Sequence, residues 1–382
     1  MTGERPALGP QPFREFILKV HSRCNLACDY CYVYMMADQS WRDRPRVMGS
    51  AVISGVAQRI AEHLHAHALW DATVVLHGGE PLLAGPRRLE DIVTRVRRAA
   101  GPGVRVTFEV QTNGVLLDRA YLDLFVRHGV RVGVSLDGDR TATDRHRRGA
   151  DGRGSHDAVT RALRLLGQPP YRPLFAGLLC TVDLGNDPVA TYEALLDHGP
   201  PMVDFLLPNG NWTYPPPQRP TDPSTTPYAD WLTAVFDRWY AAPRTTAVRL
   251  FDEILNLLLG GASRTESVGL SPSATVVVET DGSIEQVDTL KSAYHGAAVT
   301  GLTVLSHPFD AALDSPAIAV RRRGAVALSG TCRRCAVRDV CGGGLYAHRF
   351  RAGSGFDNPS VYCPDLRRLI EHVSARVRAD LI

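Results

Sequence analysis

The sequence predicts an α/β protein: a partial barrel of six β/α units, followed by a smaller α+β C-terminal extension. Three observations predict this fold. Apolar, strand-like runs alternate with helical patterns, polar motifs follow four consecutive runs (three of the motifs contain glycine), and most of the eight cysteines form two groups. Strands that alternate with helices imply a parallel sheet with right-handed crossovers. A length of 382 residues favours one large domain and a smaller one.

The elements of the predicted barrel follow in a regular order. Strands are expected at residues 16–20, 73–76, 104–110, 130–134, 174–182 and 203–207. Helices are expected between them at residues 52–64, 88–99, 119–127, 156–166 and 189–196. In the first helix Val52, Val56, Ile60 and Leu64 recur at helical spacing on one face.

The chain is expected to divide into four parts. Residues 1–12 form an N-terminal tail, 13–220 the partial barrel, 221–265 bridging helices, and 266–382 the extension. The extension begins with a hairpin over residues 275–287, turning at Asp281-Gly282, and ends with a helix over 367–381. The proline-rich stretch 208–227 is either a lid or substrate wall, or an irregular linker.

Composition narrows the class of protein. Hydrophobic residues make up 44% and charged residues 22%, as in ordinary globular proteins. A net charge of +3 is too small to indicate nucleic acid or an anionic membrane as a partner. No signal peptide and no run of about 18 apolar residues is visible, so a cytoplasmic location is expected. Disulfides rarely persist there, and grouped cysteines then indicate metal.

The motifs after the first four strands are expected to share one rim. A loop with three cysteines follows the first strand. Residues 77–81 (His-Gly-Gly-Glu-Pro), 111–114 (Gln-Thr-Asn-Gly) and 135–138 (Ser-Leu-Asp-Gly) follow the next three. In β/α barrels the chemistry lies on loops at the carboxyl ends of the strands. The sequence therefore predicts an active site at this rim.

The pattern Cys24-x3-Cys28-x2-Cys31 points to a particular chemistry. A cubane cluster has four irons, but this loop supplies three thiolates, so one iron stays open to a small molecule. The amine and carboxylate of S-adenosylmethionine (SAM) can chelate that iron. An electron from the reduced cluster then yields a 5′-deoxyadenosyl radical, which abstracts hydrogen from unactivated carbon. A partial zinc site with His21 as fourth ligand is the alternative.

These three cysteines, with Tyr30 before the last one, resemble the signature of the radical SAM superfamily. The resemblance implies a [4Fe–4S] cluster on the three cysteines and SAM as a second cofactor. It also implies SAM contacts for the following residues: Tyr30, Gly78, Gly79, Glu80, Gln111 and Ser135. Glu80 has a helix cap or salt bridge as its alternative role, and Gln111 and Ser135 have plain strand-end hydrogen bonding. The stretch from Asp144-x2-Arg147 to Ser155 resembles the peptide-modifying subgroup.

The C-terminal cysteines resemble the SPASM extension, which carries auxiliary iron–sulfur clusters. Leu345 and Val287 stand where further cysteines are usual, so the ligands of a first auxiliary cluster are missing. We predict one auxiliary [4Fe–4S] cluster with four ligands: Cys332, Cys335, Cys341 and Cys363. Structural zinc is the alternative for this site. Cys180, in the fifth strand, is interpreted as a buried structural thiol.

One carboxylate is a candidate base. In sulfatase-maturating relatives a carboxylate directly follows the cysteine at the Val287 position and acts as base, and Asp288 matches that position. A base near the radical site would remove the second proton of an oxidation. A solvated aspartate beside a hairpin is the alternative.

The wider sequence resembles maturases of peptides that end in an FxSxx-type motif. This resemblance implies a ribosomally made precursor peptide as substrate, a crosslink from an aromatic carbon to a β-carbon (a cyclophane), and an electron donor such as flavodoxin or ferredoxin. Formylglycine formation on a sulfatase and thioether formation are the alternative reactions. An inactive iron–sulfur or zinc scaffold is the non-enzyme alternative. For a redox sensor no DNA-binding element or basic patch is visible.

Overall fold

In the computed structural model, which describes residues 11–220, 222, 225–243 and 245–380, one ten-stranded sheet organises the chain. Its six central strands are parallel and adjacent in chain order, as predicted. They are β1 (Glu15–His21), β2 (Asp71–Gly78), β3 (Arg105–Thr112), β4 (Val130–Ser135), β5 (Phe175–Thr181) and β6 (Met202–Leu206).

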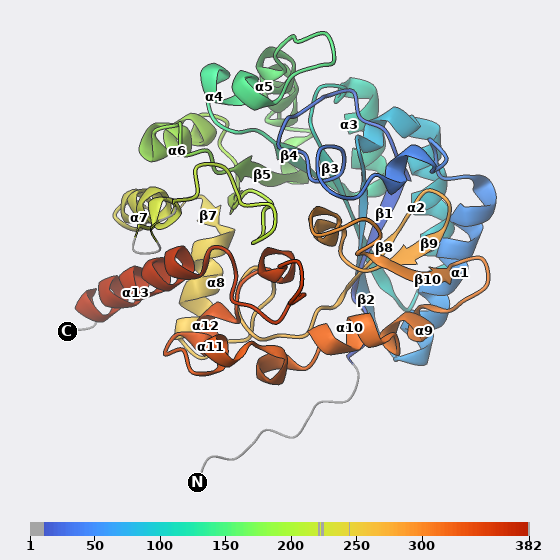
Figure 1. Ribbon diagram of the computed structural model, residues 1–382. Helices are drawn as coiled ribbons and strands as arrows, with labels where there is room; N and C mark the ends of the chain where they lie inside the picture. The colour runs from blue at the N-terminus through green and yellow to red at the C-terminus, as the bar shows by residue number, and fades with distance from the viewer. Residues whose placement is uncertain (1–10, 221, 223–224, 244, 381–382) are drawn as a thin grey trace.

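Helices cover the outer face of this curved sheet (Figure 1). The predicted ones are α1 (Ser50–Ala66), α2 (Pro86–Ala100), α3 (Arg119–His128), α5 (His156–Leu166) and α6 (Pro188–Leu196). Their ends follow local chemistry. Asp118 caps α3 by accepting a hydrogen bond from the Tyr121 N–H, and Gly129 ends it in the left-handed conformation. A short helix that was not predicted, α4 (Arg140–His146), precedes α5.

The hairpin of the extension joins the barrel sheet, which the sequence did not predict. Strand β8 (Thr275–Val278) pairs in parallel with β1, and β9 (Ser283–Glu285) and β10 (Val299–Thr303) continue the sheet antiparallel. At the other edge β7 (Ala247–Val248) pairs with β6. Segments from the barrel and from the extension therefore share one sheet. The predicted domain boundaries stay predictions.

The other helices lie across the open side of the barrel, where the C-terminal segments appear in orange and red (Figure 1). They are α7 (Pro227–Tyr240), α8 (Arg249–Leu258), α9 (Phe309–Leu313), α10 (Pro316–Arg321), α11 (Gly330–Arg333), α12 (Arg338–Cys341) and α13 (Cys363–Asp380). Short 3₁₀ helices connect the elements: η1 (Ser40–Arg42), η2 (Pro81–Ala84), η3 (Arg172–Leu174), η4 (Asp288–Ser292), η5 (Gly324–Ala327) and η6 (Tyr346–Arg349).

One hydrophobic core runs through both parts of the chain. It includes buried residues of the barrel strands, such as Phe16 and Phe108, and residues of α7 and α13, such as Phe236 and Leu369. Helix α13 begins at Cys363, earlier than predicted, because Pro364 fits the first helical turn, where a backbone N–H is not needed. Within the described part of the chain no helix has the length and apolar character that crossing a membrane requires.

Candidate active site and cluster sites

The first cysteine group lies on the loop that leaves β1. Cys24, Cys28 and Cys31 are half-buried and line one cavity of ≈ 220 Å³. The Leu26 backbone N–H and Asn113 Nδ2 both donate to the sulfur of Cys24, at 3.4 Å and 3.6 Å, and so orient it. Burial raises the pKa of the free Cys24 thiol to about 12, so bound iron would be needed to hold it as the thiolate.

The glycines at the end of β2 are required by the close approach of two backbone segments. The Gly79 N–H donates to the His21 carbonyl oxygen at 2.9 Å, which holds the end of β2 against the cysteine loop. A Cβ atom on Gly79 would lie 1.8 Å from Tyr34 Oη, and one on Gly78 would lie 2.2 Å from the His21 oxygen. Both glycines line the cavity, so a ligand there meets backbone with no intervening side chain.

Gln111 and Ser135, at the ends of β3 and β4, line the same cavity and are joined to each other. Gln111 Nε2 donates to Ser135 Oγ at 3.1 Å. Gly133 makes room for the amide, because a Cβ atom there would lie 2.3 Å from Gln111 Oε1. The structure thus brings both predicted residues to one place on the rim. Their contacts with SAM stay predictions.

Glu80 is fully buried, and its carboxylate binds protein groups behind the cavity wall. It accepts hydrogen bonds from the Leu82 N–H (2.9 Å), Thr112 Oγ1 (2.7 Å) and the Asn113 N–H (2.8 Å). Burial raises the pKa of Glu80 to about 6, although these hydrogen bonds and Arg147 lower it. Glu80 therefore caps η2 and fastens the loop after β2 to the end of β3. The helix-cap alternative is confirmed, and a contact of Glu80 with SAM stays a prediction.

Arg147 connects the cysteine loop to the loop after β4. Its Nη1 donates to Tyr30 Oη at 2.7 Å and lies 4.0 Å from Asp137, to which Tyr30 in turn donates. Arg147 lines the cavity, and its buried Nε has no hydrogen-bond partner. Burial lowers the pKa of Arg147, but Tyr30 and Asp137 beside it raise the pKa by a larger amount. A fixed positive charge therefore lies beside the cluster ligands.

The segment from Asp144 to Ser155 packs against the cysteine loop and holds it by hydrogen bonds. The Ala27 N–H donates to the Arg148 carbonyl oxygen at 2.7 Å, and Ser155 Oγ donates to the Arg147 carbonyl oxygen at 2.7 Å. Gly154 is needed because a Cβ atom there would lie 2.1 Å from Cγ of Asp144. The segment that resembles peptide-modifying enzymes therefore supports the cysteine loop through hydrogen bonds.

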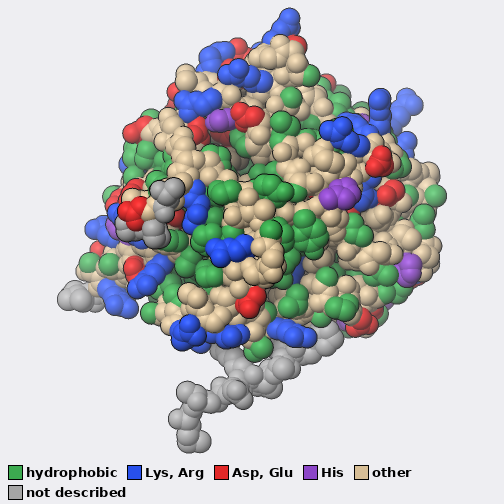
Figure 2. Space-filling model, in the orientation of Figure 1, with side chains coloured by type: hydrophobic (Ala, Val, Ile, Leu, Met, Phe, Trp, Pro, Cys, Tyr) green, Lys and Arg blue, Asp and Glu red, His purple; other side chains and the backbone are tan. Residues whose placement is uncertain are grey.

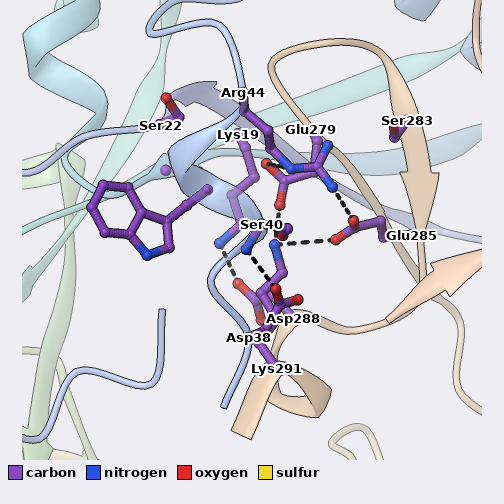
Figure 3. A network of polar contacts seen from close by, with 12 residues as sticks. Lys19, Ser22, Asp38, Ser40, Arg44, Glu279, Ser283, Glu285, Asp288 and Lys291 are labelled. Carbon is purple, nitrogen blue, oxygen red and sulfur yellow. Dashed lines mark hydrogen bonds and ion pairs between the residues drawn. The ribbon is translucent and has the colours of Figure 1, made fainter. Parts of the chain in front are cut away.

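Asp288 lies behind the cavity wall in a network of charged side chains (Figure 3). It pairs with Lys19 and accepts a hydrogen bond from Tyr32 Oη at 2.8 Å, and Lys19 Nζ lies 3.0 Å from His77 Nδ1. Although burial raises its pKa, Lys19 and His77 hold the pKa of Asp288 well below its usual range. Tyr32 and His77 line the cavity, whereas Asp288 does not. The solvated alternative is wrong, because Asp288 is buried.

The network continues from Lys19 into the extension (Figure 3). Lys291 pairs with Glu279 and, at 3.1 Å, with Glu285, and Arg44 pairs with Glu285 from the other side. Burial and the charge of Glu279 raise the pKa of Glu285 to about 7. Lys19 and Lys291 are the only lysines of the chain, and both are buried. Such pairs fix the position of the hairpin against the barrel.

Apolar packing surrounds Val287, where the sequence provides no cluster ligand. Val287 belongs to a small buried cluster that joins η4 to η6. Its other members are Leu290, Ala293, Ala297, Ala298 and Ala347, with Tyr346, Phe350 and Phe356 packed against them. Hydrophobic contact thus connects these two segments.

The four C-terminal cysteines line a second cavity, of ≈ 330 Å³. Cys332 lies in α11, Cys341 ends α12, and Cys363 begins α13, so three helices converge on this cavity, and Cys335 lies between α11 and α12. Arg349 is buried beside it and donates to the carbonyl oxygens of the three glycines that follow Cys341, at 2.6, 3.0 and 2.9 Å. The backbone next to the cysteines is therefore held rigidly.

The spacing of the sulfur atoms bears on the identity of the metal. Zinc–sulfur bonds of about 2.3 Å would bring tetrahedral ligands within about 3.8 Å of one another. Among the described residues no group of three cysteine sulfurs lies within 4.8 Å of one another. The four cysteines surround a cavity of ≈ 330 Å³, and an auxiliary [4Fe–4S] cluster there stays a prediction.

The loop after β6 begins in the active site and ends on the extension. Residues 206–209 line the cavity. Asn211 Nδ2 then donates to the Ser292 carbonyl oxygen at 3.0 Å, and Trp212 Nε1 donates to the Pro359 carbonyl oxygen at 2.7 Å. The start of this loop is therefore a cavity wall anchored to the C-terminal part.

Comparison with known proteins identifies the family. Residues 18–169 match the model of the radical SAM superfamily, and this span contains the cysteine loop and the motifs after β2, β3 and β4. The chain is an enzyme with a radical SAM domain at residues 18–169. This enzyme is similar to the serine-type anaerobic sulfatase-maturating enzyme of Klebsiella aerogenes, with 28% identity over 355 residues, or 90% of this chain and 82% of that protein. It is also similar to the cysteine-type enzyme of Clostridium perfringens, with 25% identity over 291 residues, or 72% and 74%.

Solved structures share the fold of this radical SAM enzyme. Native anSMEcpe with bound AdoMet and the Kp18Cys peptide has a TM-score of 0.80 and 21% identity, and the match covers 96% of this chain and 99% of that one. SuiB of Streptococcus suis bound to its precursor peptide SuiA has a TM-score of 0.59 and 11% identity, over 92% and 76%. The predicted barrel with a C-terminal extension is confirmed, and the FxSxx-type subgroup stays a prediction.

Proposed function

We propose that this radical SAM enzyme modifies a ribosomally made precursor peptide by joining an aromatic ring carbon to the β-carbon of a nearby residue. The observation that carries the proposal is the presence of two unlike cysteine sites in one chain. Three cysteines line a cavity that opens onto further polar residues, and four cysteines surround a second cavity without other ligands. The first suits SAM chemistry, and the second suits electron transfer.

The crosslink balances with one oxidation. The peptide loses a hydrogen atom from a β-carbon, forms one carbon–carbon bond, and loses an electron and a proton from the ring. When bound, SAM and a reduced [4Fe–4S] cluster on Cys24, Cys28 and Cys31 supply the radical that takes the hydrogen atom. An auxiliary cluster at the four-cysteine site is the acceptor we propose for the electron, and flavodoxin or ferredoxin is the external donor.

The residues of this chain bind and orient SAM, exclude water from the cavity and accept the ring proton. The backbone at Gly78 and Gly79 and the side chains of Gln111 and Ser135 face the cavity and offer polar contacts to SAM. Leu179, Leu206 and Leu207 give the same cavity an apolar wall that excludes water. For the ring proton, Tyr32 lies between the cavity and Asp288, so Asp288 would accept it through the Tyr32 hydroxyl.

A peptide is the substrate class that best fits the surroundings. On the face shown in Figure 2, hydrophobic side chains gather near the middle, where the extension meets the barrel. Two structures with this fold contain peptides, Kp18Cys and SuiA. An extended peptide that crosses this face would bring side chains to the cavity while its backbone stays outside.

Formylglycine formation is the second candidate, and the sulfatase-maturating relatives favour it. Both reactions remove two hydrogen atoms when the target is serine, so mass alone does not separate them. An aldehyde reacts with a hydrazide reagent, whereas a carbon–carbon crosslink does not. The crosslink instead suppresses fragmentation between the two joined residues.

The test is anaerobic co-expression of the enzyme with a small peptide encoded beside its gene and, separately, with a sulfatase-derived peptide. We expect the first peptide to lose two hydrogen atoms, to resist hydrazide, and to show a fragmentation gap that begins at an aromatic residue. A hydrazide-reactive sulfatase peptide with an unchanged neighbouring peptide would replace the crosslink by formylglycine formation.

A further inference from the structure

A third group of possible metal ligands lies outside both cysteine sites, where α1 meets α9. His63 and His67 are one turn apart at the end of α1 and face Asp310 of α9. Asp310 Oδ1 lies 2.6 Å from His63 Nδ1 and 3.0 Å from His67 Nε2. Among the described residues this is the one group of three or more such side chains whose ligand atoms all lie within 4.8 Å of one another.

We propose that His63, His67 and Asp310 bind a divalent transition-metal ion, with Zn²⁺ as the ion whose ligand chemistry they match. Two histidines four residues apart on a helix present their imidazoles on one face, which is the spacing that helical zinc sites use. Two imidazoles and a carboxylate are a common three-ligand set for such ions, with water or another group completing the coordination.

The surroundings fix one ligand and leave the others reachable. The His63 ring is buried against Phe16 and Phe309, with ring centres 5.9 Å and 6.3 Å away and near-perpendicular planes. The side chains of His67 and Asp310 are 27% and 42% exposed. A rigid buried histidine beside two accessible ligands provides both a preformed position and a route by which an ion and its water can enter.

A purely hydrogen-bonded contact is the rival interpretation. In it both imidazoles donate to the same oxygen, Asp310 Oδ1, while His63 Nε2 stays buried without a hydrogen-bond partner. A metal on His63 Nδ1 would instead place the ring proton on Nε2. Metal-bound histidines commonly donate this second N–H to a carboxylate, a backbone carbonyl or a water molecule.

An ion at this place would hold the barrel to the extension. Helix α1 belongs to the first β/α unit, and α9 follows β10 of the C-terminal part. In Figure 1 the two helices lie side by side at the edge of the sheet. The site is independent of the peptide-modifying activity proposed above, so either can fail without the other.

The test is a Zn²⁺ titration of the enzyme with its iron–sulfur clusters loaded, in competition with a coloured chelator. We expect wild-type protein to bind one Zn²⁺ beyond its iron content. His67→Gln and Asp310→Asn should each weaken that binding at least tenfold. His65→Gln is the matched control, because His65 lies on the same helix and its Nε2 contacts the Ala100 carbonyl oxygen at 3.1 Å. This variant should bind Zn²⁺ as tightly as the wild-type protein does.

A second readout reports the location. Zn²⁺ should slow amide hydrogen exchange in α1 and α9 of wild-type protein and leave His67→Gln unaffected. Because His67 and Asp310 are partly exposed, both variants should fold. Absence of the extra Zn²⁺ in wild-type protein, or equal affinity in wild type, His67→Gln and Asp310→Asn, would overturn the site.

Discussion

The two cysteine sites are built in different ways. The first lies on one loop after a central strand, and neighbouring strands place Gly79, Gln111 and Ser135 beside it. The second is assembled from two short helices, the loop between them and the start of the long helix α13. We predict that its four cysteines leave no iron open to a substrate. The comparison predicts that the site with fewer cysteines and more polar neighbours takes an exchangeable ligand, whereas the site with four cysteines is closed.

The largest effect should come from the first site. Cys28→Ala removes one of three ligands, so we expect no detectable 5′-deoxyadenosine and loss of about half of the iron, because a cluster with two protein ligands does not persist. Chromatography of the nucleoside products and iron analysis measure this. Cys180→Ala is the control, since Cys180 is buried in β5 and lines neither cavity. Continued SAM cleavage by Cys28→Ala would falsify the assignment of the first site.

The same change in the second site should have a different result. Cys335→Ala should also lose about half of the iron, but it should retain SAM cleavage, because the cavity at the barrel rim is untouched. Formation of modified peptide should stop, since the electron from the ring has no acceptor. The measurement compares 5′-deoxyadenosine with modified peptide in one reaction. If the second site of the wild-type protein contains zinc and no iron, the structural zinc alternative is favoured instead.

Asp288 tests whether the first site holds a base as well as the radical. Asp288→Asn should lower the yield of modified peptide at least tenfold while SAM cleavage continues, because a base typically contributes 10²–10⁴-fold. Tyr32→Phe is the companion variant: it removes the hydrogen bond to Asp288 and the path to the cavity, so it should show the same imbalance. An equal fall in cleavage and product would mean that Asp288 only anchors Lys19.

The smallest effect concerns the buried carboxylate of Glu80 and the pH dependence of the free energy of unfolding. The pKa of Glu80 is raised to about 6 in the folded protein, so the folded state binds its proton more tightly than the unfolded state does. Its contribution to stability is therefore present at low pH and is lost as the pH rises through about 6. Anaerobic urea unfolding should show a loss of about 1 kcal/mol between pH 5 and pH 7 from this group. In Glu80→Gln that part of the pH dependence should disappear.

Much of the barrel could be predicted because its signals are local. The strands carry continuous or alternating apolar runs, and each is followed by its motif, so six parallel strands and their shared rim follow from neighbouring residues. The roles of Arg147 and Lys19 could not be predicted in this way. Arg147 meets Tyr30, and Lys19 meets Asp288, across long sequence separations, and no local pattern reports such pairs. The two lysines of an arginine-rich chain were a signal that could have found the network.

The sequence by itself determined the kind of chemistry, because residue type and close spacing decide which metals and cofactors a loop can hold. Cys24, Cys28 and Cys31 predict a three-ligand cluster site wherever the loop lies. The tertiary structure alone decided that the hairpin of the extension pairs with β1, that Glu80 is a cap, and that Asp288 is a buried ion-pair partner of Lys19. These outcomes depend on which backbone edges and charges meet after folding, and contacts between distant residues are set by packing of the whole core.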